Sequence, residues 1–420
     1  MPRVTILSHF RLTVTRILEG IRVLDLTRVL AGPWSTQILS DLGAEVVKIE
    51  RPGRGDDTRQ WGPPFVKDRE GRETSDSAYF MGCNRGKKSV TLDLARPEGR
   101  EIALALARRA DVFVENFKVG DLARHGLDYD SLARENPALV YCSITGFGQD
   151  GPYRDRPGYD FMVQGLGGLM SVTGERDDLP GGGPQKVGVA VADLFTGMYS
   201  TAAILAALIH RLRTGAGQRI DMALLDVQVA MLANLSAAYL ASGEVPKRMG
   251  NAHQAIVPYH VFQAADEFLI VAVGNDGQFT RFCEVIGKPE WSADERFAAN
   301  PARVRNRDLL VGLIGERMRT KPAAEWLAAL ERAGVPCGPI KDLAQVFDDP
   351  QVKHRRMEVR APHPRAGEVR MVANPMKLSA TPVAHDRAPP LLGEHTEEVL
   401  RGWLAFDDAR LAGLREAGVV

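Results

Sequence analysis

Residues 21–50, IRVLDLTRVLAGPWSTQILSDLGAEVVKIE, decide the fold of this chain. Residues 21–26 and 45–50 (EVVKIE) are short runs of apolar and β-branched side chains, which predict strands. A turn at Gly32 separates the first run from a helical pattern over 34–42. Strand, helix and strand at this spacing predict a βαβ unit, and strands joined in this way form a parallel sheet.

The same alternation continues along the chain. A helical stretch at 98–109 precedes the apolar run 111–114 (DVFV), and another around 128–135 precedes 139–144 (LVYCSI). A long apolar helix is expected over 196–212. Short strands that alternate with helices predict a doubly wound α/β domain.

The pattern changes after this long helix. A helix rich in Ala, Leu and Met is expected at 222–241, and the alternation over 258–273 predicts antiparallel strands. Further helices are expected at 278–286, 306–318 and 322–333, and the proline-rich stretch 361–390 is expected to wrap as loop and edge strand.

Composition excludes several classes of function. Lys plus Arg number 53, as do Asp plus Glu, so no net charge attracts nucleic acid or an anionic membrane surface. No segment approaches the roughly 18 consecutive apolar residues of a membrane span. The four cysteines lack CxxC spacing and the histidines lack metal spacing, so we expect reduced thiols and no metal site.

The first residues are rich in arginine, because Arg3, Arg11 and Arg16 all precede the first acid, Glu19. A mitochondrial presequence has this bias. We favour a short N-terminal extension over 1–17 and, with it, a cytoplasmic location. A processed presequence would instead predict the mitochondrial matrix.

Gly146, Gly148 and Gly151 spell G-x-G-x-x-G directly after a predicted strand, which is the spacing of a dinucleotide-binding fingerprint. Such a site requires a helix to begin there, so that its amides face the pyrophosphate, but Pro152 and Pro157 follow. The motif therefore predicts a glycine-rich ligand loop, and we do not expect NAD as a cofactor.

Basic and amide side chains gather at the predicted strand ends. They are Arg51, Arg54 and Arg59 after 45–50, and Asn116, Lys118 and Arg124 after 111–114. Arginines on adjacent loops clamp phosphates through charge-assisted hydrogen bonds. Solvated surface charges are the alternative interpretation, and the residues by themselves leave both open.

Asp193 lies in 187–197 (VGVAVADLFTG), an apolar run that turns into the long helix. A desolvated carboxylate there is a candidate nucleophile, and amides at a helix start would stabilise a developing oxyanion. The alternative is an ordinary N-cap aspartate, which the spacing alone favours. Asp160 is a second candidate acid, with Tyr159 beside it as a donor to an acyl oxygen; the two could equally be a turn carboxylate and a packed tyrosine.

Several longer segments carry a resemblance to a known family. They are 23–33 (VLDLTRVLAGP), 43–58 (GAEVVKIERPGRGDDT), 84–93 (NRGKKSVTLD), 111–117 (DVFVENF), 141–151 (YCSITGFGQDG), 187–197, 335–340 (VPCGPI) and 391–397 (LLGEHTE). In this order and spacing they resemble class III CoA-transferases, the family of formyl-CoA transferase and carnitine CoA-transferase.

The resemblance implies a nucleophile at Asp193, against the N-cap interpretation. It places CoA contacts on Val29–Ala31, Arg51, Leu92–Asp93, Asn116–Phe117 and Arg124. It implies no permanently bound cofactor, because the substrates are CoA thioesters and small carboxylic acids.

The resemblance also implies an architecture. A large Rossmann-like domain is built from both ends of the chain, 18–215 and 336–420, and a linker helix with a smaller α+β domain occupies 216–335. In this family two such chains interlock as rings, so we expect a homodimer in which 361–390 is a wrapping linker.

Departures from family members narrow the substrate. Leu30 replaces a glutamine of formyl-CoA transferase and 251–259 replaces its glycine-rich lid, which argues against oxalate–formate exchange. Tyr159 replaces the catalytic histidine of the racemase branch, and racemisation needs an acid–base pair. Segments 60–65 (QWGPPF), 254–262 (QAIVPYHVF) and 273–279 (VGNDGQF) most resemble the branch that moves CoA from succinyl-CoA to dicarboxylates such as glutarate.

Within that branch His253 and Tyr259 are candidates for contact with the distal carboxylate of the substrate, or they simply pack. Alternatives to this function are an acyl-CoA racemase and a CoA-transferase for itaconate, mesaconate, malate or formate and oxalate. A non-catalytic CoA-binding scaffold is the alternative from another class.

Overall fold

The computed structural model describes residues 16–420, so most of the predicted extension 1–17 lies outside the described residues. The chain divides into two compact units. Of the described residues, unit 1 comprises 16–167, Gly188–Ala233 and Gln351–Val420, and unit 2 comprises Gly168–Val187 and Asn234–Pro350. Unit 1 is thus built from both ends of the chain, and the divisions fall at other residues than the expected 215 and 335.

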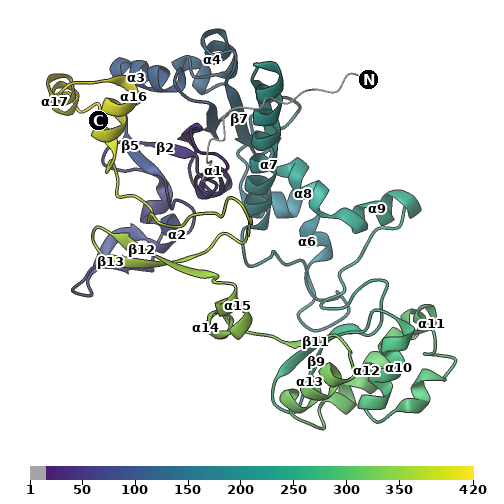
Figure 1. Cartoon of the computed structure of the whole chain (residues 1–420). Coiled ribbons are helices and arrows are strands. Elements are labelled where there is room, and N and C mark those ends of the chain that lie inside the picture. Colours follow the sequence, from purple (N-terminus) through teal and green to yellow (C-terminus); the bar gives the residue numbers. More distant parts are fainter. Residues whose placement is uncertain (1–15) are drawn as a thin grey trace, which may run out of the picture. The chain divides into compact units, whose positions relative to one another are not determined.

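Unit 1 contains a six-stranded sheet in the order β5-β2-β1-β6-β7-β8, and every neighbouring pair is parallel (Figure 1). The strands are β1 (Arg22–Leu26), β2 (Glu45–Glu50), β5 (Lys88–Thr91), β6 (Val112–Glu115), β7 (Val140–Thr145) and β8 (Gln218–Ala223). The α/β class and the strands predicted near 21–26, 45–50, 111–114 and 139–144 are confirmed. β8 was not predicted, and its last two residues fall in the stretch 222–241 that was expected to be helical.

Helices cover both faces of this sheet, as a parallel sheet requires (Figure 1). α1 (Ala31–Asp41) and α7 (Val191–Thr214) pack on one face, and α3 (Pro97–Ala107), α4 (Tyr129–Glu135), α16 (Thr396–Leu404) and α17 (Asp408–Glu416) pack on the other. The starts of two of these helices are explained by local sequence. Pro97 opens α3 at a position where no amide partner is needed, and the Asp128 carboxylate caps α4 by accepting the Ser131 amide at 3.2 Å.

Smaller elements complete unit 1. They are η1 (Asp57–Gln60), β3 (Phe65–Lys67), β4 (Glu73–Ser77), α2 (Ala78–Met81), η2 (Leu122–His125), α5 (Asp160–Leu166), α8 (Leu224–Met231), β12 (Glu358–His363) and β13 (Gly367–Val372). The helix expected over 222–241 is broken after α8, where Ala233 has a φ of 42°. The proline-rich segment forms the β12–β13 hairpin and then irregular chain, as expected.

Unit 2 has its own three-stranded sheet, in the order β11-β10-β9, and its own core around Trp326, Phe279 and Phe282. β9 (Tyr259–Gln263) and β10 (Phe268–Ala272) are antiparallel, which confirms that prediction. The other elements that lie wholly or mainly in unit 2 are α6 (Leu169–Val172), α9 (Ala233–Ser242), α10 (Asp276–Val285), η3 (Pro289–Ser292), α11 (Asn300–Arg305), α12 (Arg307–Met318), α13 (Ala323–Arg332), β11 (Cys337–Pro339) and α14 (Leu343–Asp348). The short helix α15 (Pro350–His354) begins at the division and lies mainly in unit 1.

By length and composition α7 could span a membrane, and within residues 16–420 only the bent α8–α9 pair shares this property. In the fold, however, α7 is a partly buried helix that packs closely on α1. Gly197 permits this approach, because a Cβ added there would lie 2.7 Å from the Ala31 carbonyl oxygen. Ser35 and Thr201 form a hydrogen bond between the two helices at 3.1 Å.

Candidate active site

The strand order of unit 1 places a topological switch point between β1 and β6. The chain leaves these two strands in opposite directions, and ligands of doubly wound sheets bind in the crevice that this creates at the carboxyl edge. Asn116 links the two loops there. Its amide oxygen accepts the Arg28 backbone N–H at 2.9 Å, and its amide nitrogen donates to the Arg28 carbonyl at 2.8 Å. The loop after β1 is therefore fixed against the loop after β6.

A buried ion pair also holds the loop after β1 in place. Lys48 on β2 is paired with Asp56 at 2.9 Å and donates to the Thr27 carbonyl at 2.6 Å. Asp56 in turn accepts the Val29 N–H at 3.2 Å. Val29 has a φ of 69°, which is rare for a β-branched residue and costs free energy unless its surroundings hold it. Such a held conformation is typical of functional sites.

Asp193 stands in the first turn of α7, at the same edge of the sheet. The helix starts at Val191, five residues before the expected start at 196, and its N-cap residue is Ala190. The interpretation of Asp193 as the N-cap is therefore wrong. Asp160 on α5 performs this role from another part of the chain, because its Oδ1 accepts the Ala192 N–H at 2.8 Å and the Asp193 N–H at 3.3 Å.

The environment of Asp193 disfavours its negative charge. Burial, together with the nearby Asp160 carboxylate, raises the pKa of Asp193 to about 7. Within residues 16–420 its carboxylate accepts no hydrogen bond, so its lone pairs remain available for attack. A poorly solvated, unbonded carboxylate at a helix start has the properties of a covalent nucleophile.

Tyr79 on α2 interacts electrostatically with Asp193, a relation that the sequence did not reveal. Burial and the Asp193 carboxylate raise the pKa of Tyr79 to about 12, so its phenol stays protonated and can donate a hydrogen bond. Its ring packs edge-on against the exposed Trp61, with ring centroids 5.2 Å apart. No local motif marks Tyr79, because its relation to Asp193 arises only when the chain is folded.

The glycine-rich loop after β7 holds Asp160 in position. A Cβ added to Gly146 would lie 2.5 Å from the Gly158 Cα, so the two backbone segments cross in contact. No helix follows the motif until α5 begins at Asp160, which agrees with the rejection of a dinucleotide site. The glycines serve a chain crossing that places Tyr159 and Asp160 beside the start of α7.

Comparison with known proteins shows the family. The family model described as CoA-transferase family III matches residues 18–396. The chain belongs to CoA-transferase family III. The succinate–glutarate CoA-transferase of Agrobacterium fabrum is 52% identical over 383 residues, covering 91% of this chain and 94% of that protein. The human succinyl-CoA:glutarate CoA-transferase is 43% identical over 403 residues, covering 96% and 90% of the two chains.

A solved structure agrees with this assignment. The crystal structure of a CAIB/BAIF family protein from Brucella suis is 50% identical in sequence and superposes with a TM-score of 0.83, covering 93% of this chain and all of that one. The chain is therefore a class III CoA-transferase, and the resemblance seen in the sequence is confirmed.

The structure gathers most of the expected CoA contacts of this CoA-transferase at one edge of its sheet. Arg51 is exposed directly after β2, Asn116 and Phe117 follow β6, and Arg124 lies exposed on η2, paired with Asp121 at 2.5 Å. Their contact with CoA stays a prediction. The Leu92 side chain is only 2% exposed and belongs to the core, so that residue offers a ligand its backbone alone.

One of the basic residues grouped with them has a structural role instead. Arg59 is buried and its guanidinium donates to both oxygens of Glu50, at 2.7 and 2.8 Å. It also stacks on the Phe80 ring, 3.7 Å from the centroid. Arg54 is exposed and lies 3.5 Å from Asp57. Arg59 is thus no phosphate clamp.

The expected substrate residues of the CoA-transferase fall in both units. Tyr159 is 63% exposed beside Asp160 in unit 1. His253 and Tyr259 lie in unit 2, where their ring centroids are 5.3 Å apart. The His253 Nδ1 accepts the Ala255 N–H at 3.1 Å, which leaves its Nε2 as a donor. Contact of these residues with a substrate carboxylate stays a prediction.

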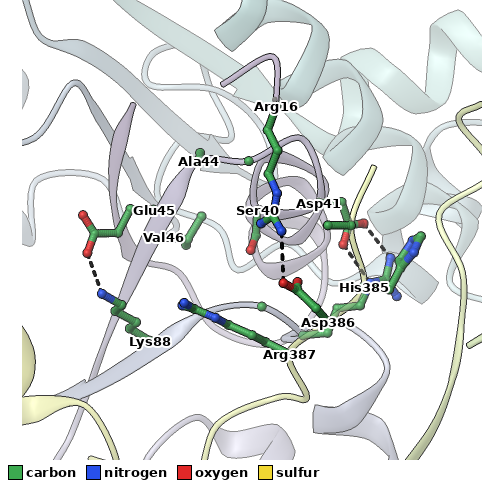
Figure 2. A pocket seen from close by; sticks show the side chains of 14 residues that line it. Arg16, Ser40, Asp41, Ala44, Glu45, Val46, Lys88, His385, Asp386 and Arg387 are labelled. Atoms are coloured by element: carbon green, nitrogen blue, oxygen red, sulfur yellow. Dashed lines mark hydrogen bonds and ion pairs between the residues drawn. The ribbon is translucent and has the colours of Figure 1, made fainter. Parts of the chain in front are cut away.

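A pocket of about 250 Å3 opens at the other edge of the sheet, where β2 and β5 begin (Figure 2). Ion pairs line it: Arg16 meets Asp386 at 3.0 Å and Lys88 meets Glu45 at 2.7 Å. Asp193 lies at the carboxyl edge, so this pocket is not the transfer site. Within residues 16–420 no group of three or more His, Cys, Asp or Glu side chains is placed to hold a metal ion.

Proposed function

We propose that this CoA-transferase moves coenzyme A from succinyl-CoA to glutarate or a similar small dicarboxylate, with Asp193 as the covalent nucleophile. The names of the relatives that it resembles over nine-tenths of its length support the donor and the acceptor. The single observation that carries the mechanism is the Asp193 carboxylate, which is poorly solvated, accepts no hydrogen bond from residues 16–420 and lies at the start of α7.

The transfer proceeds through two anhydrides and one thioester. The Asp193 carboxylate attacks the thioester carbonyl of succinyl-CoA, the C–S bond breaks, and CoA leaves as a thiolate. The thiolate attacks the aspartyl carbonyl of the mixed anhydride and releases succinate, leaving CoA on Asp193. Glutarate then attacks this aspartyl thioester and expels the thiolate. The thiolate attacks the glutaryl carbonyl of the second anhydride, which yields glutaryl-CoA and restores Asp193.

The surrounding residues supply what these steps need. Asp160 keeps the first turn of α7 in place, and we assign the neutral Tyr79 phenol, whose pKa the Asp193 carboxylate raises, as a donor to an oxyanion formed near Asp193. Exclusion of water matters as well, because hydrolysis of either anhydride would waste the thioester. The partial burial of Asp193 raises the reactivity of its carboxylate and limits its contact with water.

The nucleophile is tested with Asp193→Ala, succinyl-CoA and glutarate. We expect the variant to lose at least about 1,000-fold in kcat, because the neighbouring Asp160 carboxylate already accepts hydrogen bonds from the Ala192 and Asp193 amides and from Gln164. Hydroxylamine should convert Asp193 of the wild type to a hydroxamate only while an acyl-CoA is present, as mass spectrometry of the peptide would show. Full activity of the variant would exclude this mechanism.

The acceptor is tested with a panel of acids. With succinyl-CoA as donor, glutarate should give the highest kcat/KM, above itaconate, mesaconate, malate and oxalate. A racemase would need no acceptor acid, and here the exposed Tyr159 stands where that branch has a histidine. Turnover of a chiral acyl-CoA without any acceptor would favour the racemase instead.

We further infer that the protein acts as a homodimer. Large apolar side chains on α5 and α7 are exposed in the single chain, among them Phe161 (58%), Leu166 (53%) and Phe195 (46%). Exposed apolar side chains gathered on neighbouring helices are typical of a protein–protein interface. Sedimentation equilibrium of the wild type should give twice the mass of one chain.

A further inference from the structure

Glu115 is a buried acid that the transfer mechanism does not use. It is the last residue of β6, it is 5% exposed, and it lies beside Ser143 of β7 in the parallel register. Its two oxygens have different partners: Oε1 accepts the Ser143 hydroxyl, and Oε2 accepts the Phe117 backbone N–H at 2.7 Å. Burial raises the pKa of Glu115 to about 7, so the charged form of this side chain is disfavoured at this position.

The hydrogen bonds continue beyond Ser143 into the glycine-rich loop. The Gln149 side-chain nitrogen donates to the Ser143 hydroxyl oxygen at 2.7 Å, and the Gln149 backbone N–H donates to Asp221 of β8 at 3.0 Å. One chain of contacts therefore joins the loop after β6, the loop after β7 and the edge strand. A small cavity of about 70 Å3 lies beside it and is also lined by Arg219.

The same chain reaches the loop of the strained Val29. Phe117 is pinned by Glu115, and its neighbour Asn116 holds both backbone groups of Arg28. A shift of the Phe117 amide would move Asn116, and with it the loop that precedes α1. The Glu115 carboxyl group is the point at which these contacts meet.

We propose that Glu115 is a positioning residue for coenzyme A, which holds the loops after β6 and β7 in a single arrangement to which the coenzyme binds. The inference rests on the proposed function, in which CoA binds at these strand ends. Glu115 itself touches neither the reacting atoms nor Asp193. Its loss should therefore weaken the binding of the CoA ester and leave the chemical steps intact.

The test compares the steady-state kinetics of Glu115→Ala and Glu115→Gln with those of the wild type, varying succinyl-CoA and glutarate separately. For E115A we expect the KM for succinyl-CoA to rise about 10-fold, because the buried Ser143 hydroxyl and the partly buried Phe117 amide lose their acceptor. The kcat and the KM for glutarate should change less than about 2-fold. E115Q should stay within about 3-fold of the wild type, since its amide can accept from Phe117 and donate to Ser143.

Gln149→Leu is the second variant, because E115A leaves a buried gap and could fail to fold. Removing this half-buried amide should raise the KM for succinyl-CoA about 3-fold, whereas the matched control Gln218→Leu, on the exposed start of β8, should not. The inference is wrong if the KM for succinyl-CoA is unchanged in both E115A and Q149L. It is also wrong if these variants lower kcat and leave that KM unchanged. Inactivity of the wild type with every CoA ester would instead refute the proposed function.

Discussion

Replacing the nucleophile should stabilise the protein, and by an amount that depends on pH. The folded protein raises the pKa of Asp193 from 3.8 to about 7. At about 1.36 kcal/mol per pKa unit this shift corresponds to about 4 kcal/mol, and solvent screening of a partly accessible side chain reduces it to about 1–2 kcal/mol. Asp193→Asn keeps the shape and removes the charge, so it should recover this free energy while abolishing transfer.

The direction with pH follows from proton linkage. The pKa of Asp193 is higher in the folded state than in the unfolded state, so the folded wild type holds the proton more tightly. Its stability contribution is complete below about pH 4 and is lost as the pH rises toward and through about 7. The advantage of D193N should therefore be largest above about pH 8, smaller near pH 5 and absent below about pH 4.

Urea unfolding followed by tryptophan fluorescence, at about pH 5 and about pH 8.5, measures this difference. Asp226→Asn is the matched control, since Asp226 occupies the equivalent third position of α8 but is exposed. Asp226→Asn should lower the free energy of unfolding by up to about 0.5 kcal/mol at both pH values, because it removes a negative charge near the positive end of the helix dipole. A D193N variant that is less stable than the wild type at pH 8.5, or equally stabilised at both, would refute the reasoning.

Three further results are expected. The acid limb of the kcat/KM profile against pH reports the ionisation of Asp193, and Asp160→Asn should shift it about one pH unit lower. The substitution removes the Asp160 charge that helps to raise the pKa of Asp193, while the asparagine still caps α7. Tyr79→Phe should lower kcat about 10-fold in steady-state assays with an unchanged calorimetric unfolding temperature, because only the oxyanion donor is lost. Arg59→Met should lower the free energy of unfolding by about 3–5 kcal/mol in urea titrations, since Glu50 would be left buried without its partner.

Much of the fold could be predicted from local patterns. β1, β2 and α1 are encoded in 21–50, where apolar runs and a helical stretch alternate. β8 escaped prediction for a physical reason. It is an edge strand in which the charged Arg219 and Asp221 are exposed, so it lacks the continuous apolar run that marks a strand buried on both faces.

The site was predicted less completely, because its geometry depends on contacts between distant residues. Family motifs indicated Asp193, Arg51 and Asn116, and the fold does place them at one edge of the sheet. The Lys48–Asp56 pair that holds the loop after β1 has no periodic signal in the sequence. Paired charges of this kind are read from sequence as surface residues, and only folding shows that they are buried.

The relation between Asp160 and Asp193 joins these results. Had Asp193 been the N-cap, its carboxylate would accept helix amides, its pKa would fall and its lone pairs would be occupied. Asp160 instead accepts the Ala192 and Asp193 amides at 2.8 and 3.3 Å, so these two helix-start amides have an acceptor. The Asp193 carboxylate itself accepts no hydrogen bond from the part of the chain that the structure describes. The same two charges repel each other, which contributes to the raised pKa of Asp193. Asp193 can therefore act as a nucleophile because Asp160 caps the helix in its place and its own charge is disfavoured. This disfavoured charge lowers the free energy of unfolding of the wild type, and D193N should raise it again.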